Sequence, residues 1–118
     1  MIIKRKERRT YADRKEYIKA AVTKRRRILK AKSISLLGGA CIICHYNKHQ
    51  GVLEFHHVVQ ANKAFGIGED GSSRSWVRIE AELQKCILVC ANCHREIELG
   101  LHDAKIVKVL FEKQWAKN

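Results

Sequence analysis

The longest periodic stretch of the chain begins near its N-terminus. From Thr10 to about Leu37, apolar residues recur at intervals of three and four, the spacing that one face of an α-helix requires. Thr10 and Asp13 have the spacing of an N-terminal capping pair, and the pair at 38–39, Gly-Gly, is typical of a helix end. The pattern therefore predicts one long helix over this stretch, or two shorter ones.

Two short β-prone runs follow farther along the chain. They are VLEF at 52–55 and CILV at 86–89, and each predicts a strand. Between them, residues 66–73 have the sequence GIGEDGSS. Glycine and serine at this density indicate a flexible loop, which we expect to pack little against the rest of the chain.

Three further helices are expected around these strands. The first is capped by Ser73 or Ser75, the second runs from about Ala91 to Gly100, and the third begins after Asp103. The apolar positions expected to face the core are Trp76, Ile79, Leu83, Ile106, Val107, Leu110, Phe111 and Trp115.

Positive charge is concentrated at the start of the chain. Residues 1–32 contain 14 Lys and Arg against 3 acidic residues, whereas residues 33–118 contain 10 and 9. A segment of net charge +11 indicates a polyanionic partner, because each neutralised phosphate releases counterions and adds affinity. We expect nucleic acid; a solvated basic helix, the ribosome and an acidic membrane surface are the alternatives. The expected contacts are Lys24, Arg25, Arg26, Arg27 and Lys30, within a basic arm of residues 4–32.

Length and apolar content narrow the class of protein. A chain of 118 residues makes one domain with an extension, and its core is marginal without additional fastening, which favours a bound metal. The sequence has no run of 18 apolar residues, and MIIKRKERR lacks the apolar stretch of a secretory signal. We therefore expect a cytoplasmic protein that does not span a membrane.

Four of the five cysteines form two Cys-x-x-Cys pairs. Cys41 and Cys44 are separated from Cys90 and Cys93 by 45 residues. Two such pairs supply four thiolates to one tetrahedral zinc ion, whereas their spacing is too tight for the usual disulfide framework. The alternative, buried thiols without metal, is less consistent with the paired spacing. Cys86 lies in a β-prone run and is expected in the core.

A second set of metal-binding side chains lies beside these pairs. His56 and His57 end the first predicted strand, where alternation sends them to opposite sides unless the strand bends. His94 follows Cys93 directly, and Glu98 lies one helical turn later on the same face. If zinc fixes this helix across the strand end, His56, His94 and Glu98 surround one divalent cation and His57 faces the open side. Structural or exposed histidines and a solvated glutamate are the alternative.

Residues 38–98 resemble a known family. The string GGACIICHYNK…LEFHH…W…IEAELQKCILVCANCHREIE is similar to the HNH endonucleases of the ββα-metal class, in the zinc-stabilised branch common in bacteria and phages. The resemblance covers about half the chain. It implies an α+β fold, in which a ββα-metal module stapled by a four-cysteine zinc site occupies residues 38–118 with a C-terminal helix. The basic helical arm, residues 1–37, precedes it.

The resemblance also implies roles for individual residues. His57 corresponds to the general base and His56 and His94 to ligands of a catalytic Mg²⁺ or Mn²⁺, while the four cysteines hold structural zinc. Two departures from the family pattern leave alternatives. The family asparagine falls near Lys85, so that Asn62, Asn92 or a backbone carbonyl is left to orient His57. Many relatives carry histidine where this chain has Glu98, and His102 is the other possible third ligand.

The predicted function is metal-dependent hydrolysis of phosphodiester bonds in double-stranded DNA. One metal ion acts with a histidine base, Arg95 contacts the scissile phosphate or the backbone beside it, and no small-molecule cofactor is expected. The protein acts as a monomer or a homodimer. The alternatives are a catalytically inactive, zinc-stabilised DNA-binding protein, either a regulator or a nuclease remnant, and a basic zinc protein of the ribosome.

Overall fold

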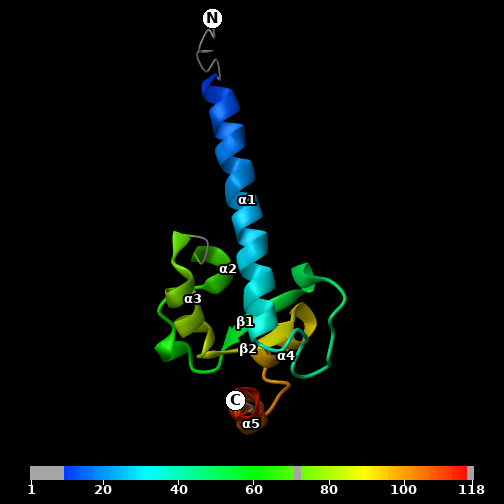
Figure 1. The fold of residues 1–118 in the computed structure, drawn as a ribbon. Helices are drawn as coiled ribbons and strands as arrows, with labels where there is room; N and C mark the ends of the chain where they lie inside the picture. The colour runs from blue at the N-terminus through cyan, green and yellow to red at the C-terminus, as the bar shows by residue number, and fades with distance from the viewer. Residues whose placement is uncertain (1–9, 71–72, 117–118) are drawn as a thin grey trace, which may run out of the picture.

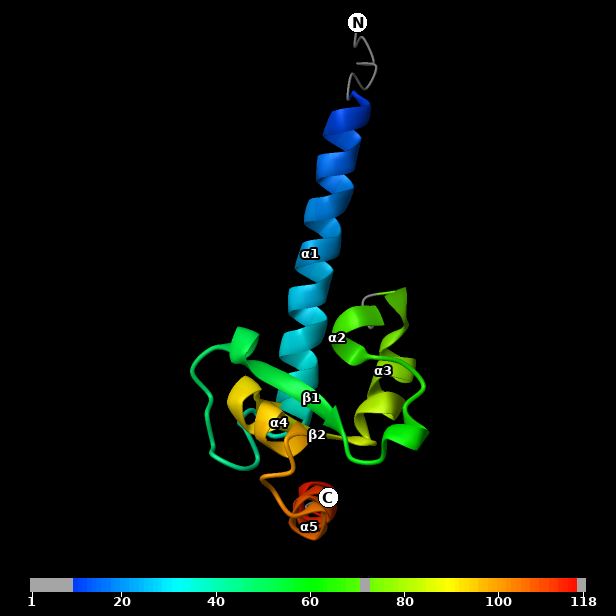
Figure 2. The same cartoon turned by 180° about the vertical axis from the view of Figure 1, so that it is seen from behind.

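A small antiparallel sheet lies at the centre of the molecule. The structure, a computed structural model, describes residues 10–70 and 73–116. Strand β1 (Leu53–His57) pairs with β2 (Cys86–Cys90), and helix α4 (Ala91–Glu98) begins at the residue after β2 (Figures 1 and 2). The chain therefore forms a ββα unit within a small α+β fold, in which two strands and one helix are packed directly against each other.

The two strands differ in burial. All five residues of β2 are buried, because β1, α4 and other helices surround the strand. In β1 only Leu53 and His57 are buried, and the residues between them are partly exposed. A continuous apolar run suits a strand covered on both faces, so Ile87, Leu88 and Val89 form the middle of the core. The two predicted strands are confirmed.

Helix α1 (Tyr11–Leu36) is a single helix of 26 residues, about 39 Å long at the usual rise per residue. Both hydrogen bonds of the capping box between Thr10 and Asp13 are present. The helix ends before Gly38 and Gly39, which adopt φ values of 102° and 83°, a region that favours glycine. The predicted long helix, its cap and its end are confirmed.

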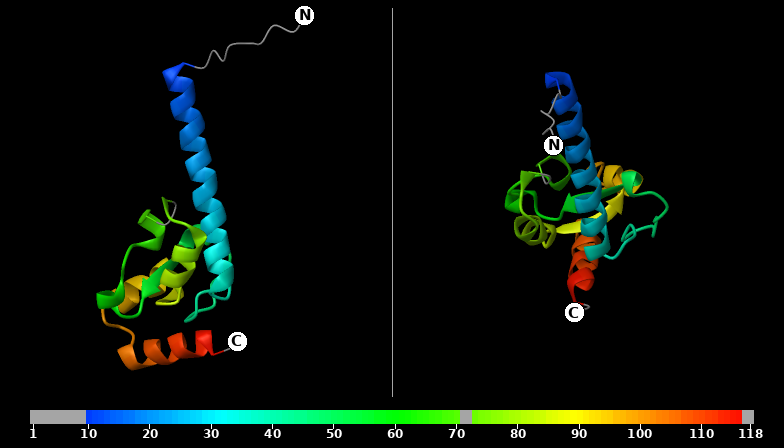
Figure 3. Two further views of the ribbon diagram at one scale, coloured as in Figure 1. Left: turned by 60° about the vertical axis from the view of Figure 1, so that its left-hand side comes forward. Right: turned by 45° about the horizontal axis from the view of Figure 1, so that its top comes forward.

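One end of α1 belongs to the core and the other does not. Near its C-terminal end, Ser33, Ile34 and the adjoining Leu37 are buried. Nearer the N-terminus of the helix, Tyr17 and Ile18 are 62 % and 60 % exposed. The N-terminal half extends away from the other elements (Figures 1 and 3). The helix is thus held by its last turns, and its basic surface is accessible.

Helices α2 (Ile67–Asp70) and α3 (Trp76–Leu83) lie on the same side of the sheet as α1 (Figure 1). The expectation of a flexible loop over residues 66–73 was wrong for its middle part, since α2 forms there and Ile67 packs against the core. Ser75 caps α3, as the second of the two predicted caps. Two short 3₁₀ turns, Gln50–Val52 and Gln60–Asn62, flank β1.

Helix α5 (Ala104–Trp115) crosses the end of the module opposite α1 (Figure 3). Asp103 caps it, and the Gln114 side chain donates a hydrogen bond of 3.0 Å to the carbonyl of Cys86 in β2. Val107 is buried, but Ile106 is 59 % exposed, so its predicted inward position was wrong. Successive helical residues are turned by about 100°, and Val107 occupies the position that faces β2. Among the described residues, no helix combines the length and apolar character needed to cross a membrane.

Candidate metal centres

The four paired cysteines come together in space. The sulfur atoms of Cys41, Cys44, Cys90 and Cys93 all lie within 4.8 Å of one another, and those of Cys44 and Cys90 are 3.6 Å apart. Tetrahedral zinc with Zn–S bonds of about 2.3 Å requires sulfur atoms roughly 3.8 Å apart. The cluster therefore could hold a metal ion such as zinc, as the spacing of the cysteines predicts.

Backbone hydrogen bonds shape each cysteine pair. The backbone N–H of Cys44 donates to the sulfur of Cys41, and that of Cys93 donates to the sulfur of Cys90, each at 3.4 Å. Burial alone raises the pKa of Cys41, but backbone N–H groups, first that of Cys44, outweigh it and lower the pKa to about 7. The thiolate, which is the form that binds metal, is therefore favoured at this position.

Cys86 has no part in this cluster. It is fully buried in β2, and its sulfur donates to the carbonyl of Glu82 at 3.6 Å. Burial, and then the charge of Glu82, raise the pKa of this thiol to about 12. Cys86 is therefore an inert core residue, as predicted.

His56 and His94 meet between β1 and α4. Their ring centroids are 5.2 Å apart, with the planes inclined at 69°. The Nδ1 atom of His56 is buried and has no hydrogen-bond partner. Burial, and then the neighbouring histidines, lower the pKa of His56. A neutral imidazole with an unpartnered buried nitrogen is the form of histidine that binds metal.

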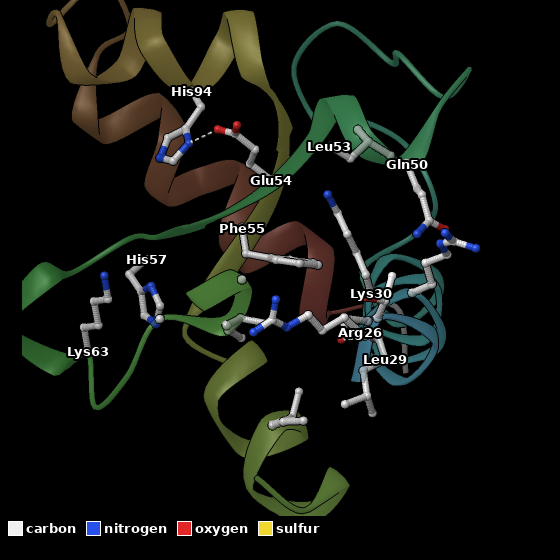
Figure 4. A pocket seen from close by; sticks show the side chains of 17 residues that line it. Arg26, Leu29, Lys30, Gln50, Leu53, Glu54, Phe55, His57, Lys63 and His94 are labelled. Carbon is white, nitrogen blue, oxygen red and sulfur yellow. Dashed lines mark hydrogen bonds and ion pairs between the residues drawn. The ribbon is translucent and has the colours of Figure 1, made fainter. Parts of the chain in front are cut away.

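Carboxylates contact both ring nitrogens of His94. Its Nδ1 lies 2.6 Å from Oε1 of Glu54, and its Nε2 lies 3.5 Å from Oε1 of Glu98 (Figure 4 shows the first pair). A carboxylate on one nitrogen fixes the ring and directs the other nitrogen to a metal ion. Sequence reasoning missed Glu54, although a residue two before His56 on a strand shares its face.

The donors of the second set, His56, His94 and Glu98, are not gathered as tightly as the thiols. Within residues 10–70 and 73–116, just two groups of three or more such side chains have all ligand atoms within 4.8 Å: the four cysteines, and Cys93 with Glu96 and His102. His102 lies 3.0 Å from Glu96. Of these donors, the imidazoles of His56 and His94 are typical ligands of transition metal ions, and the carboxylate of Glu98 is the kind of ligand that Mg²⁺ and Mn²⁺ prefer.

Comparisons with protein-family models, curated proteins and solved structures gave no match. The function proposed below is therefore based on the fold and the side chains of the site.

His57 lies on the other face of the sheet. The strand pairs regularly through its end, with His56 opposite Ile87 and His57 opposite Cys86, so the side chains alternate. His57 is 4 % exposed, and its Nε2 lies 2.8 Å from Oε2 of Glu82 in α3. The expectation that His57 faces an open side was wrong, because the strand does not bend before it.

Three groups besides burial determine the charge of Glu82. Its carboxylate accepts hydrogen bonds from the Lys85 ammonium at 2.7 Å and from the backbone N–H of Ala64 at 2.9 Å, as well as from His57. Burial alone raises the pKa of Glu82, but these contacts, Lys85 first, lower it to about 2. The ionised carboxylate can only accept, so His57 carries its proton on Nε2.

Glu82 thus contacts the ring of His57. Among the hydrogen bonds observed in the described residues, none joins that ring to Asn62 or Asn92, the two asparagines considered from the sequence. The backbone carbonyl of Asn62 instead accepts a hydrogen bond from the Lys85 ammonium at 2.9 Å, and Asn92 is exposed on α4. Sequence reasoning missed Glu82. A signal exists: Glu82 follows Ile79 by three positions and so shares the apolar face of α3, where an acid needs a partner.

A cavity of about 590 Å³ is lined by residues of β1 and of the basic helix α1 and by His94 of α4 (Figure 4); His56, Glu82 and Glu98 are not among its lining residues. His57 lines it from one face of β1, and Glu54 and His94 line it from the other. The basic side chains that also line it are Arg26, Arg27, Lys30 and Lys63. Three other predicted nucleic-acid contacts, Lys24, Arg25 and Arg95, are not among its lining residues; Arg25 donates to the carbonyl of Arg74, and Arg95 lies 3.5 Å from Glu98.

Proposed function

We propose that this protein is a metal-dependent endonuclease of the HNH, ββα-metal type that hydrolyses phosphodiester bonds in double-stranded DNA. The observation that carries the proposal is the buried, unpartnered Nδ1 of His56 beside His94, whose other nitrogen is held by Glu54. A buried polar atom without a partner is costly, so it points to a bound group. The ββα order of the elements and the adjoining four-cysteine cluster support the same proposal.

The cavity supports a path for the DNA. In the described part of the chain the sheet has two strands, so one edge of β1 is not paired. Because the cavity is lined by residues from both faces of β1, a phosphodiester at this edge can approach His57 and His94 together. Arg27 and Lys30 on α1 supply positive charge to the same cavity and bind the phosphates without reading the sequence.

The chemistry assigns one task to each histidine. With its proton on Nε2 and that atom bound to Glu82, His57 has Nδ1 to accept a proton from water. The water oxygen then forms a bond to phosphorus, the bond from phosphorus to the 3′ oxygen breaks, and solvent protonates the leaving oxygen. His56, His94 and Glu98 would hold the divalent cation, which stabilises the charge that develops on the phosphate.

Cleavage of supercoiled plasmid by zinc-loaded protein tests the proposal. With Mg²⁺ or Mn²⁺ the wild type is expected to give nicked or linear product, and without a divalent cation it is not. His57→Ala should lower the rate by at least about 100-fold while DNA binding persists, because general-base catalysis contributes 10²–10⁴-fold. His94→Ala should also lower it, because a ligand of the cation is lost. His49→Ala is the matched control, since this histidine is exposed and its ring accepts a hydrogen bond from the backbone N–H of Gly51, outside the proposed site.

A second candidate function is zinc-stabilised DNA binding without catalysis. The observation in its favour is the burial of His57, at 4 % exposure, on the face of β1 opposite His56. DNA binding by a wild type that leaves the plasmid intact across a series of divalent metals would support this candidate and refute the nuclease. Preference for structured RNA in competition with duplex DNA would refute both and favour a ribosomal partner.

A further inference from the structure

We infer that Glu82 is a positioning residue for the proposed reaction: its carboxylate fixes the ring of His57 so that Nδ1 is the nitrogen that accepts the proton. The inference rests on the proposed function. It concerns a residue on α3 rather than on the ββα unit, and therefore extends the site to a third element of the fold.

The contact between the two side chains is short and shielded from water. Nε2 of His57 and Oε2 of Glu82 are 2.8 Å apart, and the two residues are 4 % and 3 % exposed. A carboxylate at this distance stabilises the tautomer with the proton on Nε2, because the opposite tautomer would place two lone pairs against each other. Glu82 thereby determines which ring nitrogen is available.

The carboxylate is itself fixed from three directions. Oε2 also accepts the backbone N–H of Ala64 at 2.9 Å, and Oε1 accepts the ammonium of Lys85 at 2.7 Å. Lys85 in turn donates to the carbonyl of Asn62 at 2.9 Å. These bonds join α3 to the segment that follows β1, so rotation of the carboxylate would break several of them at once.

The ring position has a consequence for the substrate. His57 lines the same cavity as Arg26 and Lys63 (Figure 4), and its Nε2 is already engaged. A ring free to rotate about its side-chain bonds could direct either nitrogen to water, and much of the rate advantage from orientation would be lost. With Glu82 in place, one orientation and one tautomer are selected before DNA binds.

The test is Glu82→Gln in the full-length, zinc-loaded protein. Glutamine keeps the shape of the side chain but has no negative charge; because its oxygen must accept from Ala64, it offers His57 Nε2 only a weaker, neutral acceptor, and its amide faces Lys85. We expect kcat for plasmid nicking to fall about 100-fold or more while KM changes less than about threefold. Two-bond ¹H–¹⁵N NMR spectra of the histidine rings should show His57 protonated on Nε2 in the wild type and as a mixture of both tautomers in the variant.

Two further variants keep the test informative if Glu82→Gln folds poorly. Lys85→Met removes one anchor and leaves the bonds to Ala64 and His57, so a smaller loss of kcat, about tenfold, is expected. Glu80→Gln is the matched control, since it makes the same chemical change on α3 about 200° around the helix axis. Zinc content and thermal unfolding should match the wild type in the control.

The outcomes separate this role from the function on which it rests. If the wild type cleaves and His57→Ala does not, but Glu82→Gln cleaves within threefold of wild type, the positioning role is wrong and the nuclease stands. An equal loss of DNA affinity and kcat in Glu82→Gln would show a purely structural role and also overturn the inference. If the wild type itself does not cleave, the proposed function fails, and the role of Glu82 fails with it.

Discussion

Substituting single cysteines distinguishes a metal-bound cluster from buried thiols. Cys44 is exposed and belongs to the cluster, whereas Cys86 is fully buried and does not. In a protein without metal, Cys44→Ser is a surface substitution and should change the free energy of unfolding by no more than about 0.5 kcal/mol. Cys86→Ser places a hydroxyl in the core and costs about 1–3 kcal/mol. Burial alone therefore predicts that Cys86→Ser is the more harmful change.

Metal binding reverses this order. A structural zinc ion contributes on the order of 10 kcal/mol to folding, and loss of one of four thiolates forfeits a large part of it. Small domains have a total stability of about 5–15 kcal/mol, so Cys44→Ser should remove most or all of the cooperative unfolding transition. For a chain of this length, 1 kcal/mol corresponds to about 4 °C in Tm. A loss of even 4 kcal/mol would lower Tm by about 16 °C.

The assay is thermal unfolding by circular dichroism under reducing conditions, with zinc content measured by mass spectrometry on the same samples. Wild type and Cys86→Ser should each contain one zinc per chain, and Cys44→Ser should contain less. Chelation of the wild type should reproduce the Cys44→Ser profile. A Cys86→Ser variant less stable than Cys44→Ser, together with a metal-free wild type, would refute the reasoning.

Three other predictions concern the second site, the basic helix and the buried acid. Glu54→Gln should weaken Mn²⁺ binding about 10–100-fold, measured by titration calorimetry, because the carboxylate on His94 Nδ1 is lost; an unchanged affinity would mean that His94 does not bind the ion. Neutralising Arg27 and Lys30 together should reduce the steepness with which the logarithm of the DNA association constant falls with log salt by about 1.8, at about 0.9 for each phosphate contact. The control Lys108→Ala on α5 should leave this slope unchanged. Equal slopes for all variants would contradict binding along this cavity. Because the pKa of Glu82 is lowered from 4.5 to about 2, its ionised form stabilises the fold above about pH 4.5, and this contribution, on the order of 3 kcal/mol, is lost as the pH falls towards 2. Urea unfolding should show that the stability difference between wild type and Glu82→Gln shrinks from pH 6 to pH 3, and a constant difference would disprove that assignment.

Local patterns were good predictors where the interaction that decides the structure is itself local. The capping pair of Thr10 and Asp13, the stop at Gly38 and the cap at Ser75 each depend on hydrogen bonds or backbone angles within a few residues. The cysteine cluster belongs to the same group, because each pair is shaped by its own backbone N–H groups. Such features can be recognised without knowing what else surrounds them.

Other features depended on neighbours distant in sequence. Residues 66–73 have loop-forming composition, yet α2 forms there because Ile67 finds a core to pack against. Ile106 and Val107 are equally apolar, and only the docking of α5 on β2 decides that Val107 is the buried one.

The sequence by itself determined the ββα order of elements, the four thiols that meet and the concentration of charge on α1. The tertiary structure brought His56 beside His94. Only the tertiary structure decided which way the His57 ring points and which side chain it contacts. Strand alternation turns the ring away from His56, and a carboxylate 25 residues farther along the chain, on a helix packed beside the strand, binds it there. No periodicity within either segment encodes that contact, since it arises when α3 and β1 bury their faces against each other.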